Sequence, residues 1–164
     1  MVVPWRPMKR PRSSAAERVR ELLEQVNEAL ALDATVEIAQ PEDGVIRATL
    51  HADDLGLFIG RHGTTIDAVQ HLAYRIAAAA DDGPQRVIVD AAGYRARRRE
   101  TLEGRADRAA DQAQTNNRVV EMDPMSAQER RVVHERLKER AGIETYSEGD
   151  EPNRCVIVAP LLPE

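Results

Sequence analysis

The residues best suited to binding chemistry lie in a short glycine-flanked segment near the middle of the chain. The stretch FIGRHGTTIDAVQHL places Arg61 and His62 between Gly60 and Gly63. Glycines remove the side chains that would keep a phosphodiester backbone at a distance, and the positive charge between them would attract it. The segment also precedes an apolar-periodic stretch, so it would lie at a helix N-terminus, where unsatisfied N–H groups favour an anion. The pattern therefore predicts a phosphate-binding loop.

The same four residues also have ordinary structural interpretations. A lone G-x-x-G pattern is a weak signal, because glycines between helices more commonly serve only as C-caps and turn residues. Its position in the chain favours binding, since the loop joins two expected helices after a β-hairpin and before a third strand. A KH domain clamps about four nucleotides with a loop in this setting. A Walker A loop is excluded, because Gly63 is followed by Thr64 and Thr65 with no lysine before them.

A second set of candidates lies at helical spacing in the sequence QERRVVHERLKER. Arg130 and His134 are four residues apart and share one helix face, and Arg131 lies beside His134. A guanidinium grips a phosphate through two hydrogen bonds, and an imidazole adds a donor that strengthens as it protonates. Standing alone, such a pair is more often a solvated face or an ion-pair partner of Glu129 and Glu135. The spacing thus leaves both a phosphate contact and a salt-bridged surface open.

The elements expected before residue 93 form a compact α+β layer. Ser14 and Glu17 make a capping box that opens an amphipathic helix. Two alternating segments, ATVEIA and VIRATLH, flank the turn QPEDG and predict a hairpin. A short helix should then end at Gly60 in a left-handed C-cap, and Thr64 or Thr65 should cap a longer helix. The strand RVIVDA completes the order helix, strand, strand, helix, helix, strand.

The elements expected after this strand form a second, smaller α+β unit. A long charged segment from Tyr94 to about Asn116 carries a thin apolar stripe at helical spacing. RVVEM predicts a strand, and Ser126 with Glu129 makes a second capping box for a helix through about Arg140. IETYSE and RCVIVAP, separated by GDEPN, are typical of a closing hairpin. The three strands predict a three-stranded sheet in this unit.

These patterns divide the chain into three parts. We expect a flexible, Pro-rich basic tail over residues 1–13, a first domain over 14–92 and a second domain over 93–164. The run GYRARRRE at the start of the second domain is dense in arginine. It fits a phosphate-binding surface between the two domains and a solvated helix face equally well.

Composition narrows the class of binding site. The net charge is −5, so a polyanion site would depend on local clustering of cations. Aromatic residues make up only 3%, which counts against a protein that stacks several bases on sheet aromatics. The single Cys155 excludes an intramolecular disulfide and a cysteine-rich zinc site. No apolar run approaches the roughly 20 residues of a membrane span. We therefore expect a cytoplasmic protein with no integral membrane segment, metal or cofactor.

Two stretches of the sequence resemble known domains. DDLGLFIGRHGTTIDAVQHLAYRIA followed by RVIVDAAGYRARRRETL resembles the KH domain of the bacterial Jag family, also called SpoIIIJ-associated protein or KhpB. EMDPMSAQERRVVHERL with GDEPNRCVIVAP resembles the R-three-H domain, which is named for its arginine and histidine and is associated with single-stranded nucleic acid. The two domains occur in this order in the Jag family, and the resemblance covers roughly Ser14 to Pro160. No stretch of the sequence resembles the family's N-terminal Jag domain, so we do not expect the resemblance to imply functions that depend on that domain.

The resemblance implies a KH domain and an R-three-H domain that hold single-stranded RNA without catalysing a reaction on it, with single-stranded DNA left open. The implied binding residues are Gly60, Arg61, His62 and Gly63 in the first domain and Arg130, Arg131 and His134 in the second. It further implies a post-transcriptional regulator linked to bacterial cell elongation and division. A small KH-only protein is a candidate partner.

Two other classes of function remain as alternatives. A nuclease or phosphotransferase could use His134 as general acid or base, but it would need a second proton-transfer group or a metal cluster, which the sequence does not offer. A protein-interaction scaffold would use the same surfaces and bind no RNA. Incubation with RNA in the presence and absence of Mg²⁺ separates the three classes.

Overall fold

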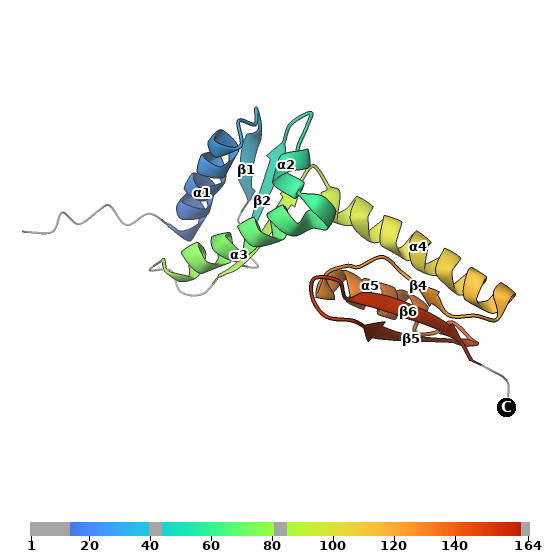
Figure 1. The fold of residues 1–164 in the computed structure, drawn as a ribbon. Coiled ribbons are helices and arrows are strands. Elements are labelled where there is room, and N and C mark those ends of the chain that lie inside the picture. Colours follow the sequence, from blue (N-terminus) through green and yellow to red (C-terminus); the bar gives the residue numbers. More distant parts are fainter. Residues whose placement is uncertain (1–13, 40–43, 81–84, 162–164) are drawn as a thin grey trace, which may run out of the picture. The chain divides into compact units, whose positions relative to one another are not determined.

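The computed structural model describes residues 14–39, 44–80 and 85–161 and divides into two compact units, of which the first ends at Tyr94 and the second begins at Arg95 (Figure 1). The tail expected over residues 1–13 and most of the QPEDG turn lie outside the described residues. In the described part, no helix combines the length and the apolar character that crossing a membrane would require.

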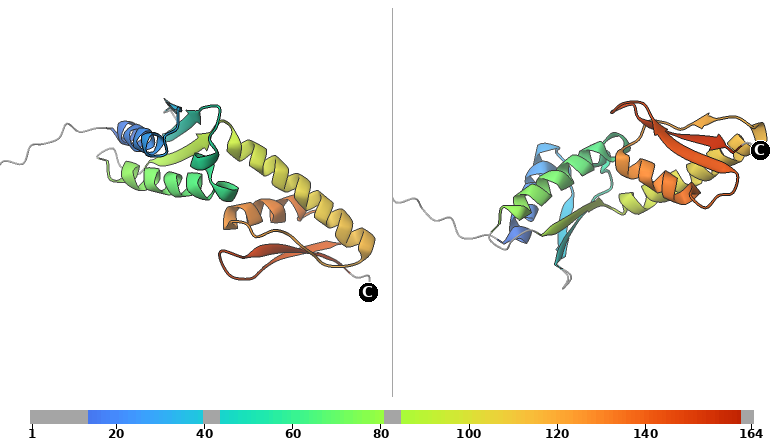
Figure 2. Two further views of the ribbon diagram at one scale, coloured as in Figure 1. Left: turned by 45° about the horizontal axis from the view of Figure 1, so that its top comes forward. Right: turned by 90° about the horizontal axis from the view of Figure 1, so that it is seen from below.

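The first unit has the predicted order helix, strand, strand, helix, helix, strand. Its elements are α1 (Ala15–Ala29), β1 (Thr35–Ala39), β2 (Val45–His51), α2 (Gly56–Ile59), the single 3-10 turn η1 (Arg61–Gly63), α3 (Thr64–Ala78) and β3 (Arg86–Ala91). The sheet order is β1-β2-β3, with β1 antiparallel and β3 parallel to the central strand β2. Helices α1 and α3 pack against each other and against the sheet (Figure 2).

Local sequence rules explain the start of this unit, and apolar burial explains its core. The predicted capping box is present: the Ser14 amide donates to Glu17 Oε2 at 2.8 Å, and the Glu17 amide donates to Ser14 Oγ at 3.3 Å. Phe58 at the end of α2 and Ile66 in the first turn of α3 are both fully buried. Because these two side chains lie on either side of the glycine loop, the core holds both ends of the loop in place.

The second unit contains the predicted three-stranded sheet and two helices. Its elements are α4 (Tyr94–Asn116), β4 (Val120–Glu121), α5 (Ala127–Leu137), β5 (Ile143–Glu148) and β6 (Cys155–Pro160). The sheet order is β4-β6-β5, and both pairings are antiparallel. Helix α5 ends at Leu137, so the expected end near Arg140 is wrong. The second capping box is confirmed, with the Glu129 amide donating to Ser126 Oγ at 3.3 Å.

Helix α4 packs through small residues. Its buried stripe consists of Leu102, Ala106, Ala109, Ala110 and Ala113, as the helical spacing in the sequence indicates. The same core contains Val133 and Leu137 of α5 and Val156 and Val158 of β6. The central strand β6 is thus buried, whereas β5 is an edge strand that lies beside α5.

Candidate nucleic-acid interface

The glycine loop of the first unit has a backbone that few residue types can adopt. Gly60 has φ 71° and ψ 177°, His62 has φ 55° and ψ 26°, and Gly63 has φ 82° and ψ 12°. The combination at Gly60 is essentially restricted to glycine, so its expected left-handed C-cap is wrong in ψ. A non-glycine residue at positive φ, as at His62, is uncommon. Such backbone persists only where the surrounding structure imposes it, and it concentrates at functional sites.

Close packing behind the loop explains why positions 60 and 63 are glycines. A Cβ atom on Gly60 would collide with the Thr65 side chain and lie 2.8 Å from the Thr65 backbone nitrogen. A Cβ atom on Gly63 would lie 3.0 Å from Tyr94 Oη and 3.1 Å from Tyr94 Cε1. Tyr94, at the start of α4, therefore supports the loop from behind, a contact that no local pattern in the sequence indicated. Larger residues at positions 60 or 63 would displace the loop.

The loop presents its basic residues to solvent at the start of a helix. Arg61 and His62 are exposed, whereas Gly63 is buried. Helix α3 begins at Thr64 with Gly63 as its N-cap and no side-chain capping bond. The expectation that Thr64 or Thr65 caps this helix is wrong, because the left-handed Gly63 already occupies the cap position. The first N–H groups of α3 therefore lack a side-chain cap directly beside two exposed basic residues, an arrangement suited to an anion.

The arginine of the second motif is buried, which corrects the expected exposed pair. The Arg130 side chain is 9% exposed. Its guanidinium donates through Nη1 to the Met125 carbonyl and through Nη2 to Glu151 Oε1, both at 2.7 Å. Met125 precedes α5 and Glu151 lies between β5 and β6, so Arg130 joins two segments of the fold. Both terminal nitrogens of the Arg130 guanidinium thus donate hydrogen bonds to groups of the protein itself.

Arg131 is the exposed cation of this helix segment. Its side chain is 80% exposed, and its Nε donates to Glu135 Oε1 at 2.8 Å. The ion pair matches the salt-bridge alternative left open by the spacing. An exposed pair of this kind contributes little to stability, so a phosphate can replace the carboxylate at small cost.

His134 lies against the edge strand β5 and is half-buried. Its Nδ1 lies 2.8 Å from Thr145 Oγ1, and its Nε2 lies 3.0 Å from Ser147 Oγ. Burial, reinforced by the positive charge of Arg130, holds the pKa of His134 below its usual value. The imidazole is therefore mostly neutral at pH 7, so it is not the protonated phosphate donor that the spacing suggested.

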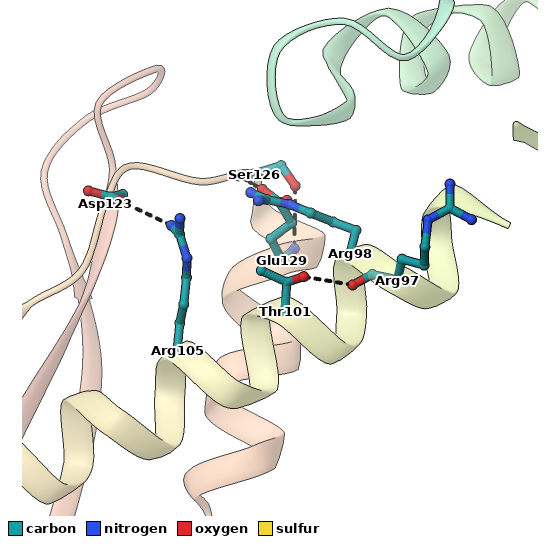
Figure 3. A network of polar contacts seen from close by, with 7 residues as sticks. All are labelled: Arg97, Arg98, Thr101, Arg105, Asp123, Ser126 and Glu129. Carbon is teal, nitrogen blue, oxygen red and sulfur yellow. Dashed lines mark hydrogen bonds and ion pairs between the residues drawn. The ribbon is translucent and has the colours of Figure 1, made fainter. Parts of the chain in front are cut away.

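The arginine-rich start of α4 has one arginine, Arg98, that bonds to α5 of the second unit (Figure 3). Arg98 Nε donates to Glu129 Oε1 at 2.6 Å, and this carboxylate also completes the cap of α5 through Oε2. About two turns further along α4, beyond this run, Arg105 Nη1 donates to Asp123 Oδ2 at 2.8 Å. The Arg97 side chain points away from these contacts (Figure 3). The run thus contains a structural arginine, Arg98, beside exposed ones such as Arg97, and it is not a uniform phosphate-binding surface.

A pocket beside His134 adds residues that sequence reasoning missed. It has a volume of about 580 Å³ and is lined by His134, Glu135, Leu137, Lys138, Ile143, Thr145, Tyr146 and Ser147. The alternation along β5 places Thr145 and Ser147 on one face of the strand. No pairing signal in the sequence connects these hydroxyls to a histidine on α5, because the contact depends on how strand and helix pack.

Comparisons with known proteins agree with the two-domain organisation. Residues 16–90 match the family described as KhpA/KhpB, KH domain, and residues 100–160 match the R-three-H domain. The chain is 36% identical to RNA-binding protein KhpB of Clostridium symbiosum over an alignment of 145 residues. This alignment covers 87% of the chain and 65% of that relative. It is 29% identical over 145 residues to RNA-binding protein KhpB of Bacillus subtilis (strain 168), covering 87% of the chain and 69% of that relative.

A further relative matches over a shorter span. RNA-binding protein KhpB of Lactiplantibacillus plantarum is 38% identical over 114 residues, which are 68% of the chain and 35% of that relative. The chain thus spans from about a third to about two thirds of the length of these relatives. The glycine loop lies in the region that matches the KH domain, and the Arg-x-x-x-His segment lies in the region that matches the R-three-H domain. With a KhpA/KhpB-type KH domain followed by an R-three-H domain, the chain belongs to the KhpB, or Jag, family.

Proposed function

We propose that the chain binds single-stranded RNA, with the loop Gly60–Gly63 holding one segment of its sugar-phosphate backbone. The observation that carries the proposal is the loop geometry: a glycine-only backbone conformation places Arg61 and His62 in solvent at an uncapped helix start. The names of the relatives, which are RNA-binding proteins, support the same conclusion.

The second unit would contribute contacts along α5. Arg131 is exposed and able to exchange Glu135 for a phosphate. Arg130 would act indirectly, by fixing the start of α5 and the loop between β5 and β6 through its bonds to Met125 and Glu151. His134, neutral at pH 7, would act through hydrogen bonds and not through charge. Of the implied binding residues on α5, we assign direct phosphate contact to Arg131.

RNA retention without cleavage is the expected behaviour. A nuclease that used His134 would need a second proton-transfer group at the reacting atom, and both imidazole nitrogens already face neutral hydroxyls. Labelled single-stranded RNA should therefore remain intact with and without Mg²⁺ while it is retained. Turnover of the RNA would replace this proposal with the enzyme alternative.

A charge-reversal experiment tests the loop. The double substitution Arg61→Asp, His62→Asp should weaken RNA binding at least tenfold in fluorescence anisotropy, because it places two negative charges against the phosphates. The matched control is His71→Asp, Arg75→Asp, which makes the same chemical change at two exposed positions later in α3. The control should lose much less affinity. Equal losses in the two variants would mean that net charge, and not the loop, governs binding.

The family resemblance extends the proposal to the cell. A protein that retains RNA without modifying it fits a post-transcriptional regulator, and the resemblance links that role to cell elongation and division with a KH-only partner. Cell length in a strain that carries the Arg61→Asp, His62→Asp variant should then change as it does in a strain without the gene. A normal cell length in the variant strain would separate RNA binding from this cellular role.

A further inference from the structure

The pocket between α5 and β5 offers an unusual set of hydrogen-bonding groups. His134, Thr145 and Ser147 form a continuous cluster in which each ring nitrogen faces one hydroxyl, at 2.8 and 3.0 Å. In the described part of the chain, neither hydroxyl has another hydrogen-bond partner. The pocket volume of about 580 Å³ lies in the range of small-molecule sites and can accommodate one nucleotide.

The bonding capacity left over by this cluster can be counted. In a neutral imidazole one nitrogen donates and the other accepts. The hydroxyl that faces the N–H accepts from it and keeps its own hydrogen, whereas the other hydroxyl donates its hydrogen to the bare nitrogen. In either tautomer the cluster therefore offers a ligand one O–H donor and lone pairs on both hydroxyl oxygens. It is a mixed donor and acceptor surface.

The charges around the pocket leave it close to neutral. Lys138 contributes one positive charge to the lining and Glu135 one negative charge, and Glu135 is itself paired with Arg131. A phosphate diester has only acceptors and would find a single hydroxyl donor in the cluster. A hydroxyl group donates and accepts at the same time, so it matches the cluster better than a phosphate does.

A sugar hydroxyl next to a phosphate is found in RNA and not in DNA. Lys138, at the end of α5, lies on the border of the same pocket and can bind the adjoining phosphate. Tyr146 also borders the pocket, but the alternation along β5 directs its ring to the face opposite Thr145 and Ser147. The hydroxyl cluster and Lys138 thus correspond to the sugar and the phosphate of one ribonucleotide.

We propose that this pocket binds one ribonucleotide and that Thr145 and Ser147, oriented by His134, select its 2′-hydroxyl. The inference rests on the proposed RNA binding and deepens it, because it makes the second unit the part that distinguishes RNA from DNA. The 2′-hydroxyl of a ribonucleotide forms a hydrogen bond with the cluster that a deoxyribonucleotide cannot form. Loss of one neutral hydrogen bond of this kind corresponds to a preference of about threefold to tenfold.

The test compares two probes that differ only in the sugar. Oligouridylate and oligo-2′-deoxyuridylate of equal length are titrated with the full chain by fluorescence anisotropy at pH 7.5. The wild-type chain should bind the RNA at least threefold more tightly. Thr145→Val with Ser147→Ala should lower this RNA-to-DNA ratio by about threefold to tenfold and leave the DNA affinity within about twofold of wild type. Unchanged DNA affinity also shows that the variant is folded.

Two controls separate the hydroxyl contact from other causes. Thr145→Ser keeps the hydroxyl and should retain the ratio. A 2′-fluoro oligouridylate keeps the sugar pucker of RNA but cannot donate a hydrogen bond, and the wild-type chain should bind it as weakly as DNA. If the 2′-fluoro probe binds as tightly as RNA, the preference comes from sugar shape and the proposal is wrong.

Two further results would contradict the proposed selection of the 2′-hydroxyl. If the Thr145→Val, Ser147→Ala variant has the same RNA-to-DNA ratio as wild type, the pocket does not select the 2′-hydroxyl and this inference is wrong. This holds whether both affinities fall together or neither changes. The proposed RNA binding is not affected by that result. A wild-type chain that does not bind the RNA probe overturns the proposed function, and the ribonucleotide pocket with it.

Discussion

Removal of the Arg130 side chain should unfold part of the second unit before it affects any phosphate contact. The guanidinium donates at 2.7 Å to the Met125 carbonyl and at 2.7 Å to Glu151, and the side chain is only 9% exposed. In an Arg130→Ala variant the Met125 carbonyl loses its buried donor, and the space of the arginine stem is left empty.

The size of the effect follows from these two bonds. A hydrogen bond to a charged group contributes about 1.5–3 kcal/mol to stability. The Glu151 side chain is 59% exposed and regains water when it loses its partner, so its bond counts for less. We expect Arg130→Ala to cost about 2–4 kcal/mol. A unit of this size has about 4–10 kcal/mol in total, so the loss is a large fraction of its stability.

Hydrogen exchange resolved by peptide is the appropriate assay, because it reports each unit separately. Peptides from α5 and from the hairpin of β5 and β6 should lose protection in Arg130→Ala, whereas peptides from the first unit should not change. The neighbouring Arg131→Ala variant is the control, since that side chain is 80% exposed and its removal should cost less than about 0.5 kcal/mol.

RNA binding should show the opposite ranking. Arg131→Ala should reduce the slope of log affinity against log salt by about 0.7, the value for one phosphate contact on a single strand. If Arg130→Ala keeps full exchange protection and reduces this slope, whereas Arg131→Ala leaves the slope unchanged, the buried arginine is the phosphate ligand and the assignment made from the structure is wrong.

Two further predictions concern the glycine loop and the histidine. Gly60→Ala should cost about 1–3 kcal/mol, because its backbone conformation suits only glycine and the new Cβ would lie 2.8 Å from the Thr65 nitrogen; faster amide exchange around the loop would show the loss, and unchanged exchange would contradict it. Because the pKa of His134 is lowered by burial, the unfolded chain binds the proton more tightly than the folded one, so stability should fall as pH falls below about 6.5. His134→Gln should remove that part of the pH dependence of the urea midpoint, and equal pH profiles in the two proteins would refute the buried neutral state.

Local rules of helix and strand formation made much of the fold predictable. The capping boxes at Ser14 and Ser126 depend on residues three positions apart, and both are present. The stripe of alanines in α4, the alternation in β5 and the continuous apolar run of β6 likewise need only neighbouring residues. Helix α5 ends earlier than predicted, at Leu137. This end could not be predicted from the sequence, because no residue before Gly142 is a typical helix C-terminal signal.

The parts that sequence reasoning could not reach depend on distant contacts. Arg130 is buried because its partner Glu151 comes from a loop 21 residues later, so its helix spacing alone indicated an exposed side chain. The conformation of Gly60 depends on the packing of Thr65, and the support behind Gly63 comes from Tyr94 in another helix. Spacing identified the candidate residues, but it could not distinguish a side chain that binds a ligand from one that binds the protein.

Ion pairs in the second unit limit how much electrostatic attraction can contribute to RNA binding. In the described part of this unit, the arginines with carboxylate partners include Arg98, Arg99, Arg105, Arg130, Arg131, Arg136 and Arg140. Each pair must be opened before a phosphate takes the place of the carboxylate, and the chain as a whole carries a net charge of −5. Long-range attraction is therefore weak, and few counterions would be released on binding. If the chain binds RNA as we propose, affinity comes mainly from short-range contacts at the glycine loop of the first unit and at the neutral hydroxyl cluster of the second.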